Sequence, residues 1–165
     1  MNIILAGMPA SGKTTVSRVL SEKLGLKLVD TDEEIVKKFG AICDIFATYG
    51  EEVFRNMETE VVKTVSGQSG LIISSGGGCL LREENVKLFK TGGKIIFLRA
   101  ELSTLLNRVE GDTSRPLLSG DKKEKMQSLL LKRSPIYEAA ADLTVDTDGL
   151  TPEQIADKII KEIRL

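Results

Sequence analysis

The stretch NIILAGMPASGKTT, residues 2–15, decides the fold because a short apolar run leads directly into a glycine-rich loop. Asn2–Ala6 is short and apolar, which is typical of a strand buried on both faces of a parallel sheet. Gly7–Thr14 then fits the pattern G-x-x-x-x-G-K-[ST] in full. Apolar residues recur at helical spacing from Val16 to Leu24, and Gly25 marks the expected helix end.

This order of strand, loop and helix predicts a site for the phosphates of a nucleoside triphosphate. Gly7 and Gly12 permit backbone torsions that a side chain would block, so successive N–H groups can surround a phosphate. The helix that starts near Lys13 points its positive end at the same anion. Lys13 would reach the β- and γ-phosphates, and the Thr14 hydroxyl would coordinate Mg²⁺. The alternative is a glycine-rich turn that matches by chance. The residues expected to contact ATP in this loop are Gly7, Ala10, Ser11, Gly12, Lys13, Thr14 and Thr15.

Strand-like and helical patterns alternate along the rest of the chain. Further strands are expected at Lys27–Val29, Leu71–Ser74, Lys94–Leu98 and Leu143–Val145. Helices are expected over Glu51–Val65 and from Pro152 onward, where Thr151 is the cap and Ile155, Ile159 and Ile163 form the inward stripe. This alternation predicts an α/β fold, a three-layer α/β/α arrangement around a five-stranded parallel sheet, with one domain over residues 1–165. The polar, glycine-containing stretch Glu110–Lys123 shows no clear periodicity and predicts a mobile loop.

Composition excludes several classes of function. The chain has 165 residues with 23 basic and 24 acidic side chains, a formal net charge of −1, so it lacks the basic surplus of a nucleic-acid or anionic-membrane binder. No apolar run approaches the ~20 residues of a spanning helix, and no signal peptide is evident. Cys43 and Cys79 form no CxxC pair and the chain has no histidine, which argues against a zinc site and favours free thiols in the cytoplasm. Any proton acceptor must therefore be a carboxylate, a lysine or water.

Two polar segments follow the second and third predicted strands, where open α/β sheets bind ligands. Asp30 and Asp32 project to the same side if their segment is extended, so one can serve a metal through water and the other a substrate hydroxyl. The alternative is that such acids cap a helix, and the spacing does not decide between the two. Gly76–Gly78 would let a ligand approach the backbone and offers N–H donors, with a plain flexible turn as the alternative.

Several arginines are candidates for anion binding. Arg55 and Glu58 lie on one helix face, where the carboxylate can orient the guanidinium for bidentate capture of a ligand carboxylate. The alternative is a surface ion pair of little energetic value. Arg133 is a second candidate. Arg108 and Arg115 bracket the start of the mobile loop, and an arginine in a loop that closes over phosphates can stabilise the charge that develops during transfer.

Together these segments resemble the shikimate kinase family, a group of nucleoside-monophosphate-kinase-like P-loop kinases. The match runs in order along nearly the whole chain, through GMPASGKT, VDTD, IFATYGEEVFRNMETE, SSGGG, RPLL and RSPIYEAAA. Many nucleotide-binding proteins share the first segment, whereas the combination of FRxxE, GGG, RPLL and RxPxYxxxA is far more specific. The resemblance implies transfer of the γ-phosphoryl group of ATP to the 3-hydroxyl of shikimate, with Mg²⁺, by a P-loop kinase fold with a lid at about residues 110–123 and substrate-binding helices at about residues 31–62.

On the substrate side, the resemblance implies a role for each matching position. Asp32 would hold the substrate hydroxyls and act as the candidate base, Arg55 and Arg133 would clamp the carboxylate, and Glu58 would position Arg55. The backbone N–H of Gly77 would meet a ring hydroxyl. The full set expected to contact or position shikimate is Asp32, Arg55, Glu58, Gly76, Gly77, Gly78 and Arg133.

On the nucleotide side, the resemblance implies that Arg115 reaches the phosphates from the lid, that Arg108 packs against adenine and that Pro152 lies in the adenine loop. The third strand ends without the aspartate that many P-loop proteins place there, a lack the family shares, which leaves Asp30 as an outer-sphere partner of a Mg²⁺ ion held by Thr14. The catalytic residues would be Lys13, Asp32 and Arg115.

Two alternatives of different kinds stay open at this point. One is another small P-loop kinase, of gluconate or of a nucleoside monophosphate, and FRxxE followed by GGG favours shikimate over both. The other is a nucleotide-binding regulatory module that has lost catalysis, against which the presence of Lys13, Thr14, Asp32 and Arg115 speaks. A monomer that acts on a small-molecule substrate in the cytoplasm is expected.

Overall fold

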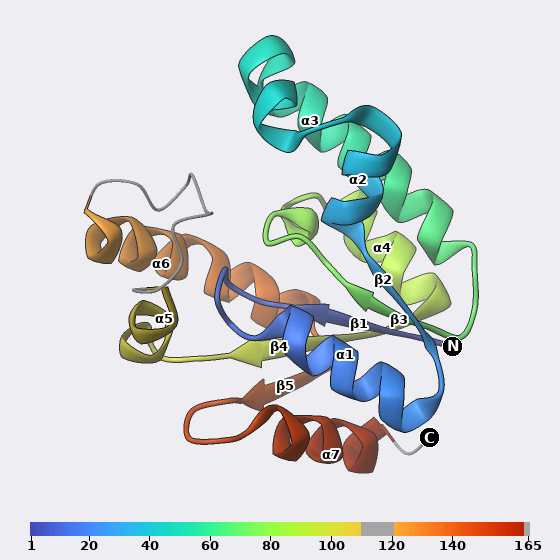
Figure 1. The fold of residues 1–165 in the computed structure, drawn as a ribbon, viewed down its shortest axis with the longest axis vertical. Helices are drawn as coiled ribbons and strands as arrows, with labels where there is room; N and C mark the ends of the chain where they lie inside the picture. The colour runs from blue at the N-terminus through green and yellow to red at the C-terminus, as the bar shows by residue number, and fades with distance from the viewer. Residues whose placement is uncertain (110–120, 164–165) are drawn as a thin grey trace.

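Five parallel strands form one sheet in the order β2-β3-β1-β4-β5, as the computed structural model shows (Figure 1). The structure describes residues 1–109 and 121–163. The strands are β1 (Asn2–Ala6), β2 (Lys27–Asp30), β3 (Leu71–Ser74), β4 (Gly93–Arg99) and β5 (Leu143–Asp146). Each paired strand runs parallel to its neighbour, so each connection must cross a face of the sheet, and helices make these crossings.

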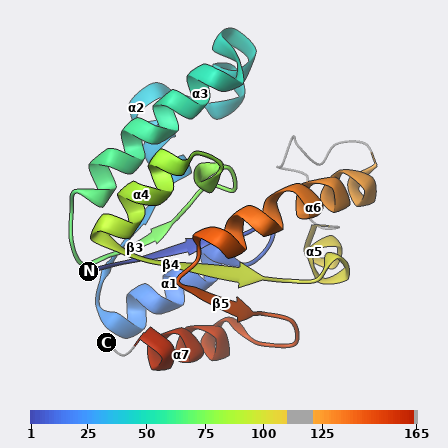
Figure 2. The same ribbon diagram turned by 180° about the vertical axis from the view of Figure 1, so that it is seen from behind.

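The helices cover both faces of the sheet, and α3 projects beyond its edge (Figures 1 and 2). They are α1 (Lys13–Leu24), α2 (Thr31–Phe39), α3 (Ile42–Ser66), α4 (Glu83–Gly92), α5 (Leu102–Val109), α6 (Lys122–Ala140) and α7 (Pro152–Ile163), with a short 3₁₀ turn η1 (Cys79–Leu81). Helices α1 and α7 pack together on one face, whereas α4 and α6 lie on the other (Figure 2).

The alternation of strand side chains produces two apolar cores, one on each face. In β1, Ile3 and Leu5 pack toward α1 and α7, whereas Ile4 and Ala6 pack toward the core that α3, α4 and α6 cover. All four side chains are fully buried. A strand covered on both faces must be apolar at every position, which is why the sheet reads as continuous apolar runs in the sequence. This arrangement confirms the predicted three-layer fold with a five-stranded parallel sheet.

The predicted helix and strand bounds are largely confirmed, with three corrections. Strands β2, β4 and β5 each end one residue later than predicted, at a polar residue, because backbone pairing with the neighbouring strand includes that residue. These residues are Asp30, Arg99 and Asp146. Helix α3 starts at Ile42, before the predicted Glu51, although the non-helical torsions of Gly50 (φ 82°, ψ 178°) divide it just ahead of Glu51. The predicted loop end at Lys123 is wrong, because Asp121 caps α6 through the N–H of Glu124 and the helix already begins at Lys122.

The carboxyl ends of β1, β2 and β3 meet at one edge of the sheet, and the turns that follow them lie side by side. Ser75, just after β3, donates from both its N–H and its hydroxyl to the carbonyl of Leu5 in β1. The glycine-rich loop after β1 therefore adjoins the three-glycine loop after β3. Among the residues that the structure describes, no helix is long and apolar enough to cross a membrane.

Candidate active site

The loop between β1 and α1 has the backbone conformation of a phosphate cradle. Gly7 (φ 154°) and Gly12 (φ 93°) have positive φ values, and so does Ala10 (φ 66°), a non-glycine residue in a strained region that the sequence pattern did not reveal. A side chain at Gly7 would lie 2.8 Å from the carbonyl oxygen of Leu98, so only glycine fits there. Gly12 also precedes the first turn of α1, which directs its N–H groups toward the loop.

The Lys13 ammonium lies over this loop. Its Nζ donates to the carbonyl oxygens of Gly7 and Met8, both at 2.8 Å, and Ser11 Oγ lies 3.5 Å away. Ser11 is buried, whereas Thr14 and Thr15 in the first turn of α1 are exposed. The ammonium therefore lies against the loop backbone at the start of α1, and its role toward the phosphates of a nucleotide stays a prediction.

Arg108 reaches the same loop from α5, nearly a hundred residues further along the chain. Its Nη1 donates to the carbonyl oxygen of Ala10 at 3.1 Å, and a Cβ on Gly12 would lie 3.7 Å from that nitrogen. Pro152 is the first residue of α7. The N–H of Thr151 donates to the side chain of Gln154, and the N–H of Gln154 donates to the Thr151 hydroxyl, which makes a reciprocal cap. Arg108 is therefore next to the phosphate loop, and the roles of Arg108 and Pro152 toward adenine stay predictions.

The two predicted metal residues lie beside one cavity. A cavity of about 230 Å³ is lined by Thr14 in the first turn of α1, Asp30 at the end of β2 and Ser74 at the end of β3. The other charged side chains that line it are Arg18, Lys27, Glu33, Glu34 and Lys37. Among the described residues, no group of three or more Cys, Asp or Glu side chains could hold a metal ion alone. One hydroxyl and one carboxylate fit Mg²⁺, which binds proteins through few side chains and takes its other ligands from water and substrate phosphates.

Of the two alternatives that the spacing left open for Asp30 and Asp32, the extended segment is not the one observed, because α2 begins at Thr31. Asp30 caps this helix, with Oδ1 accepting from the N–H groups of Asp32 (2.9 Å) and Glu33 (3.2 Å). The helical reading that the sequence left open is therefore correct for Asp30. The helix turns Asp32 away from Asp30 and toward the loop after β3, where a Cβ on Gly76 would lie 2.6 Å from Asp32 Oδ1.

The three-glycine loop gathers the predicted substrate residues. Gly76 lies against Asp32 of α2, a Cβ on Gly77 would lie 3.2 Å from Nη1 of Arg133 of α6, and a Cβ on Gly78 would lie 2.1 Å from Nη1 of Arg55 of α3. Each of the three glycines thus contacts one of the three side chains. Glycine is required because any side chain would displace these groups.

Arg55 and Glu58 form a largely buried pair rather than a surface ion pair. Arg55 Nη1 lies 3.1 Å and 3.0 Å from the two carboxylate oxygens of Glu58, whose side chain is 1% exposed. Glu51 also approaches the guanidinium, at 3.5 Å. Burial raises the pKa of Glu58, and the charge and hydrogen bonds of Arg55 oppose that rise. A carboxylate with so little access to water fixes the guanidinium in one position.

Two further residues, Thr31 and Tyr137, bind the backbone of the three-glycine loop, and the sequence alone did not identify them. Thr31 accepts a hydrogen bond from the N–H of Gly76, and the Tyr137 hydroxyl donates to the carbonyl of Gly77. Both side chains are buried. The tyrosine of RxPxYxxxA lies one helical turn after Arg133, and this spacing was the only signal in the sequence that it shares the site.

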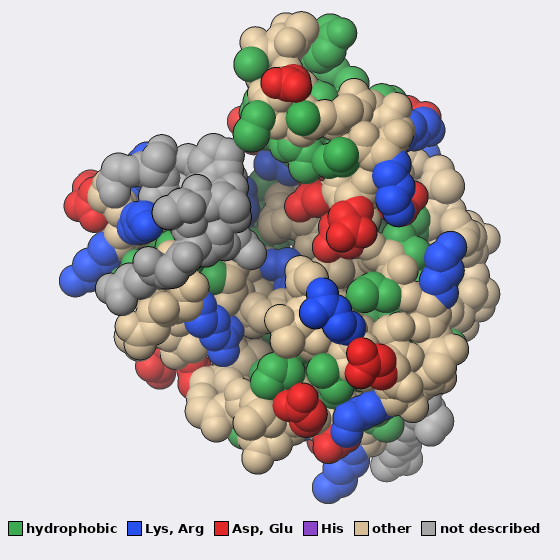
Figure 3. Space-filling view, in the orientation of Figure 1, with side chains coloured by type: hydrophobic (Ala, Val, Ile, Leu, Met, Phe, Trp, Pro, Cys, Tyr) green, Lys and Arg blue, Asp and Glu red, His purple; other side chains and the backbone are tan. Residues whose placement is uncertain are grey.

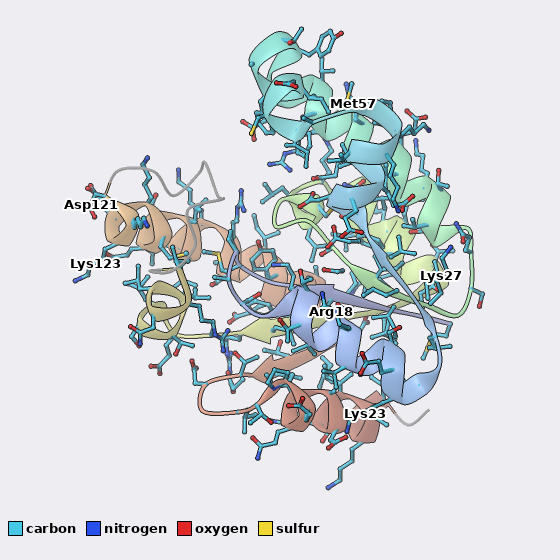
Figure 4. All side chains as sticks on the ribbon, in the orientation of Figure 1. Arg18, Lys23, Lys27, Met57, Asp121 and Lys123 are labelled. Carbon is cyan, nitrogen blue, oxygen red and sulfur yellow. The ribbon has the colours of Figure 1, made fainter. Side chains whose placement is uncertain are left out.

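Figure 3 shows this face of the molecule hollowed next to the α2–α3 projection, with basic side chains inside the hollow and acidic ones on its α2 side. Arg115 and most of the predicted lid lie outside the described residues, so the role of Arg115 stays a prediction. Figure 4 shows where the described chain resumes, with Asp121 and Lys123 at the outer end of α6, away from Met57 on α3.

A phosphate cradle beside a sheet of this strand order, facing a cationic acceptor site, defines the class of P-loop phosphotransferases. Comparison with known proteins narrows the class. The model of the family described as shikimate kinase matches residues 9–164. The chain belongs to the shikimate kinase family.

Individual relatives agree with this assignment over more than nine-tenths of their lengths. The chain is 46% identical over 161 residues to the shikimate kinase of Caldicellulosiruptor bescii, covering 96% of this chain and 93% of the relative. It is 44% identical to that of Thermodesulfovibrio yellowstonii, covering 98% and 94%. The solved structure of the Acinetobacter baumannii shikimate kinase in complex with shikimate superposes with a TM-score of 0.93 at 36% identity, covering 99% of this chain and 92% of that one.

Proposed function

We propose that this chain phosphorylates shikimate in the hollow that the phosphate loop and the three-glycine loop line together, next to the α2–α3 projection (Figure 3). The reaction is that of its family, transfer of the γ-phosphoryl group of ATP to the 3-hydroxyl of shikimate, which gives shikimate 3-phosphate and ADP. The observation that carries the assignment is the contact of Gly76, Gly77 and Gly78 with Asp32, Arg133 and Arg55.

The acceptor must be an acid because two guanidinium groups converge on this loop. Arg55 and Arg133 come from different helices and lie beside adjacent glycines, where like charges repel unless an anion lies between them. Glu58, which is buried, and Glu51 both form ion pairs with Arg55 rather than with Arg133. A substrate carboxylate supplies the missing negative charge, and planar guanidinium groups bind carboxylates in a bidentate manner.

On the nucleotide side, the loop N–H groups, Lys13 and the start of α1 bind the triphosphate. Bound Mg²⁺ would supply charge neutralisation at the phosphate oxygens, with Thr14 and Asp30 as the protein groups nearest to it. Arg108 holds the loop through Ala10 and is placed to contact the nucleotide. Phosphoryl transfer asks for positioning and charge stabilisation more than for covalent work by the protein.

Asp32 orients the acceptor hydroxyl and accepts its proton. The chain has no histidine, so the proton acceptor must be another group, and Asp32 is the carboxylate that lies against the three-glycine loop. Lys13 and Arg115 would stabilise the charge that develops on the transferred group. Closure of the predicted lid would exclude water and prevent idle hydrolysis of ATP.

We also propose a cytoplasmic monomer. Within this chain Asp32, Arg55 and Arg133 already lie together at the three-glycine loop, and the exposed thiol of Cys43 suits a reducing compartment. Sedimentation equilibrium of the purified protein checks the monomer, and a concentration-dependent dimer contradicts it.

One assay tests the function directly: ADP release from the purified protein with shikimate, gluconate and AMP offered separately. Turnover with shikimate alone is expected, whereas turnover with gluconate or AMP alone contradicts the proposal. ATP binding without turnover on any acceptor would support a regulatory module. In the same assay Arg133→Ala should raise the shikimate KM strongly and leave the ATP KM nearly unchanged. Lys132→Ala, an exposed cation next to it on α6, is the matched control and should match the unsubstituted protein.

A further inference from the structure

The three-glycine loop is held in place by two buried hydroxyl groups that approach it from opposite sides. The N–H of Gly76 donates to Thr31 Oγ1 at 2.8 Å, and the Tyr137 hydroxyl donates to the carbonyl oxygen of Gly77. Thr31 is fully buried and Tyr137 is 1% exposed. Neither side chain is placed to contact a substrate directly, since each is covered by the elements around it.

Each of these residues belongs to a helix that also carries a substrate-facing side chain. Thr31 directly precedes Asp32 in the first turn of α2, and Tyr137 follows Arg133 by one turn of α6. The loop is therefore attached to the two helices whose side chains it contacts. A shift of the loop would change its distance to Asp32 and to Arg133 together.

The two hydrogen bonds fix the peptide units before and after the Gly76–Gly77 peptide, whose N–H is the one proposed to bind the substrate. The central peptide joins Gly76 to Gly77, and its carbonyl oxygen accepts from the N–H of Cys79 at 3.0 Å. Thr31 fixes the peptide before it and Tyr137 fixes the peptide after it. With its carbonyl directed toward Cys79, the central peptide must direct the N–H of Gly77 the opposite way, because the two groups are antiparallel in a trans peptide.

Glycine makes such external fixation necessary. A run of three glycines has no side chains to pack and can rotate its peptide units at little steric cost, so its conformation depends on backbone hydrogen bonds. The Thr31 hydroxyl also lies 3.5 Å from Cys79 Sγ, so one oxygen can accept from Gly76 and direct its hydrogen to sulfur. Burial raises the pKa of Tyr137 to about 12, opposed by the neighbouring Arg133, so the tyrosine keeps its proton for the bond to Gly77.

We propose that Thr31 and Tyr137 are positioning residues for shikimate, which hold the Gly77 N–H and the loop in register with Asp32 and Arg133. The inference rests on the proposed function of this site. It adds two residues that act on the acceptor through the loop backbone and leave the phosphate loop unaffected. Phosphoryl transfer is sensitive to such positioning, since a misplacement of about 1 Å can cost roughly a hundredfold in rate.

The test compares Tyr137→Phe, Thr31→Val and Thr31→Ser with the unsubstituted protein, using ADP release at varied shikimate and varied ATP. Tyr137→Phe and Thr31→Val should each lower kcat/KM for shikimate by roughly ten- to a hundredfold, while the ATP KM changes by less than about twofold. Thr31→Ser keeps the hydroxyl and should restore most of the loss. Activity of the unsubstituted protein on shikimate separates this test from that of the proposed function.

Matched controls separate positioning from loss of stability. Tyr49→Phe removes the exposed tyrosine of α3, and Thr147→Val removes a buried hydroxyl that donates to the Arg99 carbonyl outside the site. Thr147→Val should lower the Tm about as much as Thr31→Val and leave shikimate kinetics unchanged. Wild-type shikimate kinetics in Tyr137→Phe and Thr31→Val would overturn the proposal, as would equal losses for shikimate and ATP. If Thr31→Val does not fold, Tyr137→Phe alone still decides the proposal by the same kinetic comparison.

Discussion

Substitution of Gly78 by alanine tests the glycine loop most directly. The added methyl group collides with a charged side chain, whereas the backbone conformation needs no change. Gly78 has φ −95° and ψ −1°, which alanine adopts readily. Its Cβ would lie 2.1 Å from Arg55 Nη1 and 2.5 Å from both Cζ and Nη2. Ordinary contact begins near 3.4 Å, so the guanidinium must move by at least about 1.3 Å, the difference between 3.4 Å and 2.1 Å.

A movement of that size is large enough to break the hydrogen bonds that hold the guanidinium. Nη1 lies 3.0 Å and 3.1 Å from the carboxylate oxygens of Glu58, and a displacement above 1 Å removes both bonds. Removing one partner from a fully buried ion pair costs about 3–5 kcal/mol of unfolding free energy. Because Arg55 retains a small exposure to water, the expected loss here is somewhat smaller, about 2–4 kcal/mol. Misplacement of one arm of the carboxylate clamp should lower kcat/KM for shikimate by about a hundredfold.

The assay is steady-state ADP release at varied shikimate with saturating ATP, together with thermal unfolding. Gly67→Ala is the matched control, because Gly67 also has helical torsions and its Cβ would meet only ordinary contacts of 3.5 Å and 3.6 Å. A second comparison adds Gly78→Ala to Arg55→Ala. Since both changes act on the same guanidinium, the double variant should lose little beyond the arginine change alone.

Unchanged shikimate kinetics in Gly78→Ala would refute the reasoning. Such a result would mean that Arg55 can leave its position without effect on the acceptor, and therefore that it does not bind the acceptor. Full additivity of the two changes would also contradict the proposed steric route, because it would show that the methyl group acts elsewhere.

Three further predictions concern the acceptor, the nucleotide and a buried phenol. Asp32→Asn should fold with a Tm close to that of the unsubstituted protein and lose most of its kcat, and near-normal turnover would contradict its role as base. Arg108→Ala should raise the ATP KM about three- to tenfold with the shikimate KM unchanged, because one charge-assisted hydrogen bond to the phosphate loop is lost. In Tyr49→Phe, Tyr137 is the single tyrosine, and its ultraviolet absorbance should titrate with a pKa of about 12 in the folded protein and near 10 after unfolding. Between these values the native state holds a proton that the unfolded state has lost, so the unfolding free energy falls as pH rises, and titration near pH 10 in the folded protein would contradict the burial of Tyr137.

Local sequence patterns were enough to predict the layers of the fold and the phosphate loop. The apolar run of β1 needs cover on both faces, and Gly7 and Gly12 need torsions that other residues avoid. Both requirements act over a few neighbouring residues, so they can be recognised in the sequence alone. The family motifs also predicted which side chains face the acceptor, and the contacts of Arg55 and Arg133 with adjacent glycines support that prediction.

The spacing of Asp30 and Asp32 left two alternatives open for a physical reason. Two acids with one residue between them project to the same side of a strand but to different sides of a helix, and the spacing alone does not say where β2 ends. The structure ends β2 at Asp30, which then caps α2 and sends Asp32 toward Gly76. The position of the helix start therefore decides which way the two carboxylates point, and the sequence spacing does not give that position.

By itself the sequence determined the strand and helix periods and the phosphate-loop motif, and through its family motifs it predicted which charged residues face the acceptor. Tertiary structure alone decided how the glycine loop is held, because Thr31 lies 45 residues before Gly76 and Tyr137 lies 60 residues after Gly77. Their hydrogen bonds exist only because parallel pairing places the end of β3 between β2 and β1, with α2 and α6 on either side. No local propensity records such a contact, since it depends on the order of strands in the sheet and on the burial that this order creates.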